Sequence, residues 1–223
     1  MSEHSKHVII YSHGFGVEQS ARGMFTDIAA AFPVAEHIMF DYNIPNREEN
    51  TLTVRPLSEQ KDILLAEITR AKEKTPDAII DIIAHSQGCI VVALALPEGI
   101  RKAIFLAPPL EMSSTSLRRF AGRPGSVIDP DGLSRLARSD GSITLVPAEF
   151  WKEREAIDPV ALLNTYSAHI ELVLVRAKND TVVSTSNFPT LSSHIQIISI
   201  DGDHDFRYAS RPGLIEKIRN LLQ

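Results

Sequence analysis

The sequence predicts an α/β fold in which a mostly parallel six-stranded sheet carries helices on both faces. Three observations support this prediction. Short apolar runs rich in β-branched residues recur along the chain, segments with helical spacing separate them, and residues 111–155 interrupt the alternation. Strands that alternate with helices form parallel sheets, because each helix returns the chain to the end of the sheet where the previous strand began.

Six apolar runs are the predicted strands. The first, HVIIYS, stops just before Gly14, as a buried parallel strand stops at a turn. The others are equally short and are rich in isoleucine, leucine and valine. The predicted strands are residues 7–12, 37–42, 78–84, 102–107, 170–175 and 195–200.

Apolar residues at helical spacing predict the helices between these strands. Pro33 ends the first helix, and Pro212 fits the first turn of the last one. The polar, proline-containing stretch at 43–56 carries no predicted element. The predicted helices are residues 18–32, 58–73, 89–96 and 212–222.

Residues 111–155 contain no strand–helix unit and are expected to form a small cap with a β-hairpin. The Asp140-Gly141 pair lies between RLAR and ITLV, and such a pair is a strong signal for a hairpin turn. Phe120, Phe150 and Trp151 favour an ordered segment over a disordered one. An insertion of this length in a compact domain is usually a lid or a binding loop.

Length and composition narrow the possible functions. A single domain is expected over residues 1–223, and the formal net charge of −5 gives no general attraction to nucleic acid or to anionic membranes. Cys89 is the single cysteine, so no intrachain disulfide forms, and its helical position predicts a small buried side chain. The N-terminal apolar run is too short for a signal peptide or a membrane span, which indicates a cytoplasmic protein. The sequence carries no signal for an oligomeric state.

The segment DIIAHSQGCIVV, residues 81–92, places Ser86 between a predicted strand and a predicted helix. This strand–turn–helix context is the one that a nucleophilic serine requires in a G-x-S-x-G elbow. Gly88 permits close approach of helix and strand, and Ala84 is small enough to replace the first glycine. Taken alone, the segment leaves open whether Ser86 is a nucleophile or a helix-cap residue.

The rest of the chain supplies the partners that a nucleophilic serine needs. These are a base, a carboxylate that orients the base, and N–H donors for the oxyanion. Asp180 follows the fifth predicted strand and His204 the sixth, so both are expected at the carboxyl edge of the sheet with Ser86. The sequence therefore predicts the triad Ser86, Asp180 and His204, with oxyanion N–H groups from Phe15 and Gln87.

In these motifs the chain resembles the α/β-hydrolase family. The resemblance covers nearly the whole chain outside 111–155 and rests on the HGFG turn at 13–16, the Ala-His-Ser-Gln-Gly elbow at 84–88, Asp180 and His204, in that order. The two N-terminal antiparallel strands of the family are missing, which implies a short, six-stranded version. The insertion follows the strand after which the family places its cap. The hairpin cap, HGFG and GDHDF are also similar to small microbial carboxylesterases of the feruloyl/cinnamoyl type.

The loop that contains His204 allows two other interpretations. Asp201, Asp203 and Asp205 alternate as calcium ligands do, but Phe206 and Pro212 stand where an EF-hand loop has glycine and a bidentate glutamate. Asp203 and Asp205 are also rival orienters of a histidine. Neighbours in sequence rarely face the same ring nitrogen, so neither is preferred, and no metal site is predicted.

Several residues are candidates for contact with the substrate: His13, His85, Phe150 and Trp151. The two histidines have a structural alternative, and the two aromatic residues have an equal alternative in packing the cap against the body. The cap is rich in arginine, which is either a solvated surface or an attraction for an acyl group bearing a carboxylate or phosphate. These arginines are residues 118, 119, 123, 135 and 138.

Together these motifs predict a serine hydrolase that cleaves a carboxylic ester or a related acyl compound through an acyl-enzyme. The expected partner is a small-molecule acyl substrate, with no metal or organic cofactor. The same triad serves thioesterases, lactonases, peptidases and acyltransferases, and a non-catalytic receptor would use the same pocket.

Overall fold

The computed structural model describes residues 6–112, 122–183 and 190–223. Its main sheet contains the six predicted strands in the spatial order β10-β9-β6-β5-β1-β2, and each neighbouring pair is parallel. The strands are β1 His7–Ser12, β2 Glu36–Met39, β5 Ile79–His85, β6 Lys102–Leu106, β9 Glu171–Ala177 and β10 Gln196–Ile200. The predicted sheet is confirmed, and it is parallel throughout.

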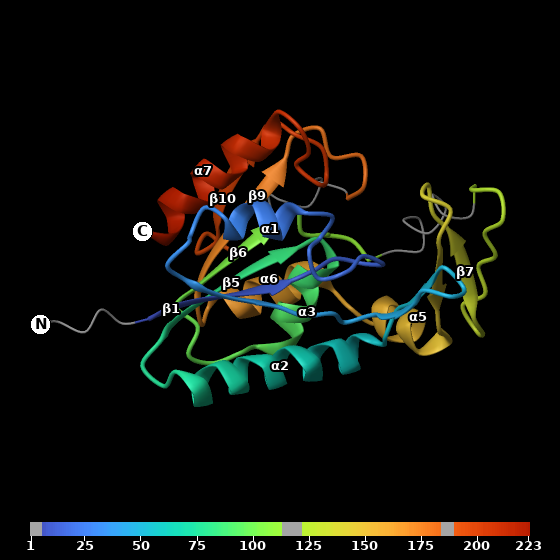
Figure 1. Cartoon of the computed structure of the whole chain (residues 1–223), viewed down its shortest axis with the longest axis horizontal. Helices are drawn as coiled ribbons and strands as arrows, with labels where there is room; N and C mark the ends of the chain where they lie inside the picture. Colours follow the sequence, from blue (N-terminus) through green and yellow to red (C-terminus); the bar gives the residue numbers. More distant parts are fainter. Residues whose placement is uncertain (1–5, 113–121, 184–189) are drawn as a thin grey trace, which may run out of the picture.

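Helices cover both faces of this sheet, as predicted. Helices α1 and α7 lie on one face, and α2, α3 and α6 lie on the other (Figure 1). The bounds of the helices are α1 Met24–Ala29, α2 Leu57–Lys74, α3 Gln87–Ala95, α5 Ala148–Glu155, α6 Pro159–Ser167 and α7 Ser210–Leu222. This arrangement buries the sheet completely except at its edges, as its unbroken apolar strands require.

The alternation of side chains along each strand divides the core into two parts. In β6, Phe105 packs with the residues of α2, α3 and α6, whereas Ile104 and Leu106 pack with those of α1 and α7. The same period of two separates Leu174 from Val173 in β9. Cys89 of α3 is fully buried in the first part, which confirms its prediction as a small core side chain.

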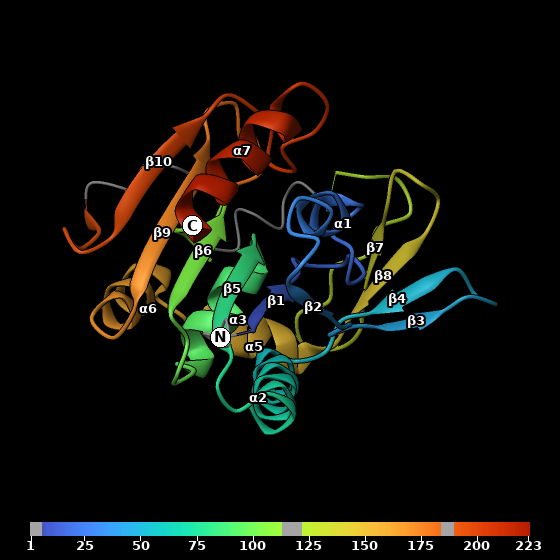
Figure 2. The same cartoon turned by 60° about the vertical axis from the view of Figure 1, so that its left-hand side comes forward.

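A second, four-stranded sheet lies beside the main one and belongs to the cap (Figure 2). The predicted hairpin at Asp140-Gly141 is confirmed, because β7 Ser134–Ala137 and β8 Ile143–Val146 pair antiparallel on either side of it. A second hairpin, β3 Ile44–Asn46 and β4 Thr51–Thr53, extends the sheet through a parallel pairing of β4 with β8. The division into one domain with a cap at 111–155 stays a prediction. The second sheet is not confined to that segment, because β3 and β4 come from residues 44–53.

The helix and strand assignments need correction in four places, and one of them is helix α5, which lies in a segment with no predicted helix. The predicted helix at 18–32 is reduced to α1, because Ala21, Arg22 and Gly23 have positive φ angles of 46°, 57° and 86° that interrupt a right-handed helix. Helix α6 was not predicted, although Asp158 caps it by accepting a hydrogen bond from the Ala161 N–H at 3.1 Å. The strands at 44–53 were also not predicted.

Within the described ranges, no helix is both long enough and apolar enough to cross a membrane.

Candidate active site

Ser86 stands at a sharp turn between β5 and α3. Its φ of 53° and ψ of −125° are unfavourable for a residue with a side chain. Two backbone hydrogen bonds hold this conformation: the Ser86 N–H donates to the Leu106 carbonyl at 2.9 Å, and the Cys89 N–H donates to the Ser86 carbonyl at 3.0 Å. These bonds keep the turn in its strained conformation. In this conformation the half-buried Ser86 borders a pocket.

Two glycines allow the elbow to approach the first strand. A Cβ at Gly88 would lie 2.2 Å from the Ser12 carbonyl oxygen, a distance that backbone atoms cannot tolerate. A Cβ at Gly14 would lie 3.1 Å from the Ser86 Cβ. The HGFG turn after β1 is thereby brought against the serine, as the sequence predicted from the two motifs.

His204 and Asp180 reach Ser86 from the loops that follow β10 and β9. The His204 Nε2 lies 2.9 Å from the Ser86 Oγ, and the His204 Nδ1 lies 2.8 Å from an Asp180 carboxylate oxygen. The other Asp180 oxygen accepts from the backbone N–H groups of Val182 at 2.7 Å and Val183 at 3.0 Å. The structure thus brings the three predicted residues into one chain of hydrogen bonds.

The electrostatics of Asp180 fix the tautomer of His204. Burial alone would raise the pKa of Asp180, but the hydrogen bond and charge of His204 and the two backbone N–H groups outweigh burial and lower it. Asp180 is therefore ionised at neutral pH and can only accept hydrogen bonds. His204 must then donate from Nδ1, which leaves Nε2 as the acceptor for the Ser86 hydroxyl.

The rival carboxylates are engaged elsewhere. Asp203 accepts from the backbone N–H and the guanidinium of Arg207, at 2.9 and 2.7 Å. Asp205 forms an ion pair with Arg22 at 2.8 Å. Neither carboxylate takes the place of Asp180 at the His204 Nδ1.

His85, which precedes Ser86, connects the elbow to the histidine loop. Its Nε2 donates to the His204 carbonyl at 2.9 Å, and the two imidazole rings lie 4.9 Å apart. Burial, followed by the nearby charge of His204, lowers the pKa of His85 to about 4, so its ring is neutral at neutral pH. The Nδ1 is buried without a hydrogen-bond partner among the described residues. His85 therefore positions the backbone of His204, a role that the sequence did not reveal.

The predicted oxyanion donors border the same space as Ser86. Phe15 and Gln87 both line the pocket, and Gln87 is the first residue of α3, where backbone N–H groups point out of the helix. The Gln87 side chain points away, toward Gln60 at 3.1 Å. The Phe15 ring packs 5.4 Å from Phe150. These side-chain contacts fix the backbone on both sides of the serine.

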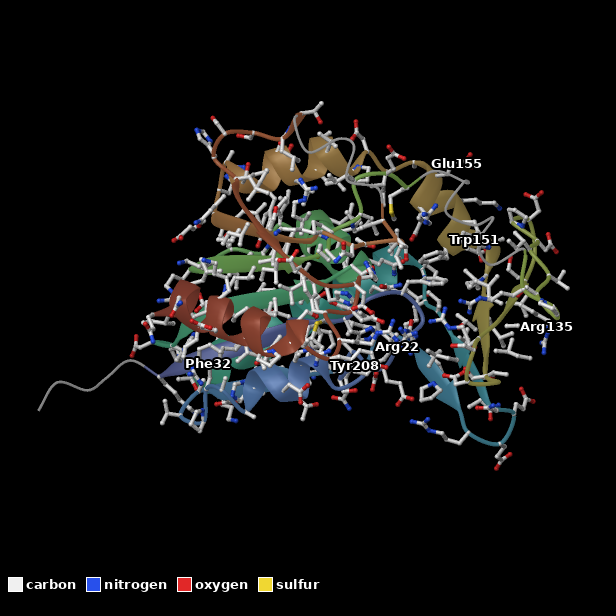
Figure 3. The ribbon with its side chains drawn as sticks, turned by 90° about the horizontal axis from the view of Figure 1, so that it is seen from above. Arg22, Phe32, Arg135, Trp151, Glu155 and Tyr208 are labelled. Atoms are coloured by element: carbon white, nitrogen blue, oxygen red, sulfur yellow. The ribbon has the colours of Figure 1, made fainter. Side chains whose placement is uncertain are left out.

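The pocket has a volume of about 590 Å³ and is formed by the body and the cap together. Trp151 from α5 and Arg22 from the body, both labelled in Figure 3, lie in its wall. Of the four predicted substrate residues, His85 and Trp151 line the pocket, whereas His13 and Phe150 do not. The volume suits a small organic molecule.

The two residues outside the lining have structural roles. His13 is 1% exposed; its Nδ1 donates to the Gly14 carbonyl at 3.0 Å, and its Nε2 accepts from the Tyr42 N–H at 2.9 Å. These bonds use both ring nitrogens to hold the HGFG turn. Phe150 is fully buried between Phe15 and Trp151, so it packs the cap onto the body. The prediction of a substrate contact is therefore corrected for both.

The arginines of the cap have different positions. Arg123 and Arg138 line the pocket, while Arg135 is exposed on β7 and lies outside the lining. Arg118, Arg119 and Phe120 lie outside the described residues. Arg154 of α5 also lines the pocket, and no sequence pattern singled it out, because it lies among the alternating charges of AEFWKERE.

One group of described residues offers three metal-ligating atoms within 4.8 Å of one another: His85, His204 and Asp205. Both ring nitrogens of His204 are engaged with Ser86 and Asp180, and Asp205 is paired with Arg22. An ion there would have to displace these contacts, so the donor set suits proton transfer better than metal binding.

No protein family is matched by the sequence, and no curated protein matches it. Solved structures do match. Est1E from Butyrivibrio proteoclasticus is 16% identical, with a TM-score of 0.70 over 98% of this chain and 87% of that one. A structure from work on LipS and LipT, two metagenome-derived lipolytic enzymes, is 18% identical, with a TM-score of 0.68 over 97% and 93%.

A third similar structure is the Pyrococcus furiosus esterase Pf2001, which is 15% identical, with a TM-score of 0.69 over 98% of this chain and 81% of that one. At such low identity the similarity establishes the fold only, and the type of reaction depends on the residues of the site. The chain has the α/β-hydrolase fold in a short form, with a cap built on a second sheet.

Proposed function

We propose that this protein is a serine hydrolase that cleaves a carboxylic ester or a related acyl compound through an acyl-enzyme. The observation that carries the proposal is the chain of hydrogen bonds from Asp180 through His204 to Ser86, at 2.8 and 2.9 Å, which opens into the pocket beneath the cap. A serine hydroxyl is a weak nucleophile until an oriented base removes its proton.

Acylation begins with attack of the Ser86 Oγ on the substrate carbonyl carbon. The hydroxyl proton passes to the His204 Nε2, and the carbonyl π electrons move to oxygen to give a tetrahedral oxyanion. Asp180 stabilises the imidazolium without taking its proton. As the oxyanion collapses, the bond to the alcohol breaks, and the His204 Nε2 returns the proton to the leaving oxygen.

The oxyanion is stabilised by the N–H groups of Phe15 and Gln87. Two observations support this assignment of the oxyanion donors. Phe15 and Gln87 line the same pocket as Ser86, and Gln87 begins helix α3, whose dipole is positive at that end. Their backbones are fixed before the reaction, so little reorganisation opposes charge development.

Deacylation repeats the proton transfers with water. His204 takes a proton from water, the hydroxide attacks the acyl carbon, and the Ser86 Oγ leaves with the proton from Nε2. The products are a carboxylic acid and the free serine. The similar structures include esterases and lipolytic enzymes, which supports ester hydrolysis as the class of reaction. Ferulic acid is bound to Est1E in one of them.

Substitution of the serine tests the proposal. Ser86→Ala is expected to lower turnover of a short p-nitrophenyl ester by at least about 10⁴-fold, because it removes the nucleophile. The melting temperature should stay close to that of the wild type, since alanine keeps the Cβ of serine and removes only the hydroxyl group. Ser193→Ala, on an exposed position outside the pocket lining, is the matched control and should keep the wild-type rate.

Retention of wild-type turnover by Ser86→Ala would contradict the proposal. A panel of esters, thioesters, lactones and aminoacyl amides of varied acyl size then identifies the preferred bond. A purely receptor role predicts binding of these compounds with no product and no reaction with a serine-directed inhibitor.

A further inference from the structure

The HGFG turn, which contains the proposed oxyanion donor Phe15, is held from two sides. On the side of the body, the His13 Nδ1 donates to the Gly14 carbonyl at 3.0 Å. That carbonyl and the Phe15 N–H belong to one planar trans peptide and point in opposite directions, so the bond from His13 also orients the N–H. The body therefore fixes the peptide that precedes Phe15.

The cap holds the residue that follows Phe15. Arg138, the first residue after β7, donates from its guanidinium to the Gly16 carbonyl at 3.0 Å. Thr144 of β8 lies against the same glycine, because a Cβ on Gly16 would be 3.2 Å from the Thr144 Oγ1. Gly16 has a φ of 61°, which glycine adopts without strain. The second half of the turn is thus covered and anchored by the cap hairpin.

Helix α5 of the cap holds the side chain of Phe15. The ring centroids of Phe150 and Trp151 lie 5.4 and 6.4 Å from that of Phe15, and both residues are buried. The Trp151 Nε1 donates to the Ser134 Oγ in β7 at 2.9 Å, which ties the aromatic pair to the cap sheet. Aromatic rings at such distances pack in a few preferred orientations, so the pair restricts the Phe15 ring.

Helix α5 is itself anchored away from the pocket. The Glu153 carboxylate accepts from the Ser58 N–H at 3.0 Å and from the Ser58 hydroxyl at 2.5 Å, in the first turn of α2. A carboxylate suits this position, because the helix dipole is positive there. Neither residue lines the pocket, so α5 is held on the body by contacts that do not involve a substrate.

From these contacts we infer that the cap is part of the oxyanion site, and that Arg138 and Phe150 are positioning residues that keep the Phe15 N–H directed at the tetrahedral intermediate. The inference rests on the proposed function and gives the cap a second role besides enclosing the pocket. Donors fixed in advance stabilise the charge that develops in the transition state more than they stabilise the bound ester. Loosening the turn should therefore lower kcat more than it weakens substrate binding.

Two variants loosen the turn from different elements. Arg138→Met removes the guanidinium bond to Gly16, and Phe150→Leu removes the ring that packs on Phe15. Phe150 lies outside the pocket lining, so its replacement deletes no lining side chain. We expect each variant to lower kcat for p-nitrophenyl esters at least about tenfold and to change KM by less than about threefold. Melting curves set an assay temperature at which both variants are folded.

The length of the acyl chain separates positioning from a lost substrate contact, which matters because Arg138 also lines the pocket. p-Nitrophenyl acetate and p-nitrophenyl hexanoate present the same carbonyl group to Ser86. A displaced oxyanion donor lowers kcat for both esters by the same factor, whereas a lost contact with the acyl chain changes the two by different factors.

Inhibition by a trifluoromethyl ketone gives a second readout. Addition of the Ser86 Oγ to the ketone carbonyl gives a tetrahedral adduct whose oxyanion needs the same N–H donors. The inhibition constant should rise in both variants by about the factor by which kcat/KM falls. Arg135→Met is the matched control, since Arg135 is exposed, lies outside the pocket lining and is far from the body in Figure 3. It should keep the wild-type constants.

The outcomes separate the inference from the proposed function. Loss of turnover in Ser86→Ala, together with wild-type kinetics in either cap variant, would overturn the inference and leave the proposed function intact. A rise in KM alone, or unequal losses on the two esters, would also overturn it and would indicate a substrate contact. Equal turnover by the wild type and Ser86→Ala would contradict the proposed function and the inference together.

Discussion

At each of the two edges of the main sheet where its strands begin and end, a buried carboxylate bonds to a histidine, but the third partner differs. At the carboxyl end, His204 bonds to Asp180 and continues to Ser86. At the other end, His7 bonds to Asp81 at 2.7 Å, and the third partner is Arg101, with a 2.9 Å bond from its Nε and a second, shorter contact. A similar acid–histidine pair thus belongs to a proposed catalytic triad at one end and to an ion-pair network at the other.

The partner decides what each carboxylate does. Burial would raise the pKa of Asp81, but hydrogen bonds from His7 and Arg101 outweigh burial and lower it, so the group is a buried anion held by these two donors. Arg101 also donates to the Leu222 carbonyl at 3.1 Å, which ties α7 to the sheet. We therefore expect the Asp81 end to stabilise the fold and the Asp180 end to activate a nucleophile.

The largest expected effect is a loss of enzymatic activity when Asp180, but not Asp81, is replaced. Asp180→Asn should lower kcat for an ester by about 10³- to 10⁴-fold, because the amide no longer requires a proton on the His204 Nδ1 and does not stabilise the imidazolium. The melting temperature should change little, since the amide oxygen can still accept from Val182 and Val183.

Asp203→Asn is the matched control for that variant. It removes a nearby carboxylate that is bonded to Arg207 instead of His204, so activity should stay near the wild-type value. Loss of activity by both variants to the same extent would contradict the assignment of Asp180.

The next effect concerns stability. Asp81→Asn should lower the free energy of unfolding by about 3 kcal/mol, because it removes the charge of a fully buried carboxylate that accepts hydrogen bonds from both His7 and Arg101. Urea unfolding at neutral pH measures this loss. At a temperature where the variant is folded, its kcat should equal that of the wild type. A fall in kcat comparable to that of Asp180→Asn would contradict the structural role of Asp81.

A comparable effect, confined to acidic pH, depends on His85. The pKa of His85 is about 4 in the folded protein, below the ordinary value of 6.5, so between these values only the unfolded chain takes up the proton. Stability should therefore fall as the pH decreases through this range, by about 3 kcal/mol from His85. Burial lowers the pKa of His13 as well, so part of the loss remains in any His85 variant.

His85→Gln tests this contribution, because its amide N–H can still donate to the His204 carbonyl but does not titrate. Urea unfolding at several pH values should show a smaller acid-induced loss for the variant than for the wild type. Parallel stability curves for the two proteins would show that His85 does not carry the effect.

The comparison of the two ends also explains what the sequence could predict. The six strands were predictable because each is a short apolar run, and the order Ser86, Asp180, His204 follows from the residue that comes after each strand. The Asp81 network was not predictable, since His7 and Arg101 are ordinary surface types. The register of β1 with β5 brings His7 to Asp81, and the register of β5 with β6 brings Arg101 there.

The cap was harder to predict than the body. Strands β3 and β4 are three residues long, and β3 contains Pro45, so no period-two pattern is visible in the sequence. Arg22 and Arg154 lie far apart in the sequence and reach one pocket only through the packing of α5 against the body. A pocket wall that is assembled from distant segments has no local sequence pattern by which it could be predicted.

The most direct test of the central claim is reaction with a fluorophosphonate, followed by intact mass and peptide mapping. The account predicts a single adduct on Ser86, formed at a similar rate in the wild type and in folded Asp81→Asn, and orders of magnitude more slowly in Asp180→Asn. An adduct on another serine, or equal slowing by the two substitutions, would contradict it.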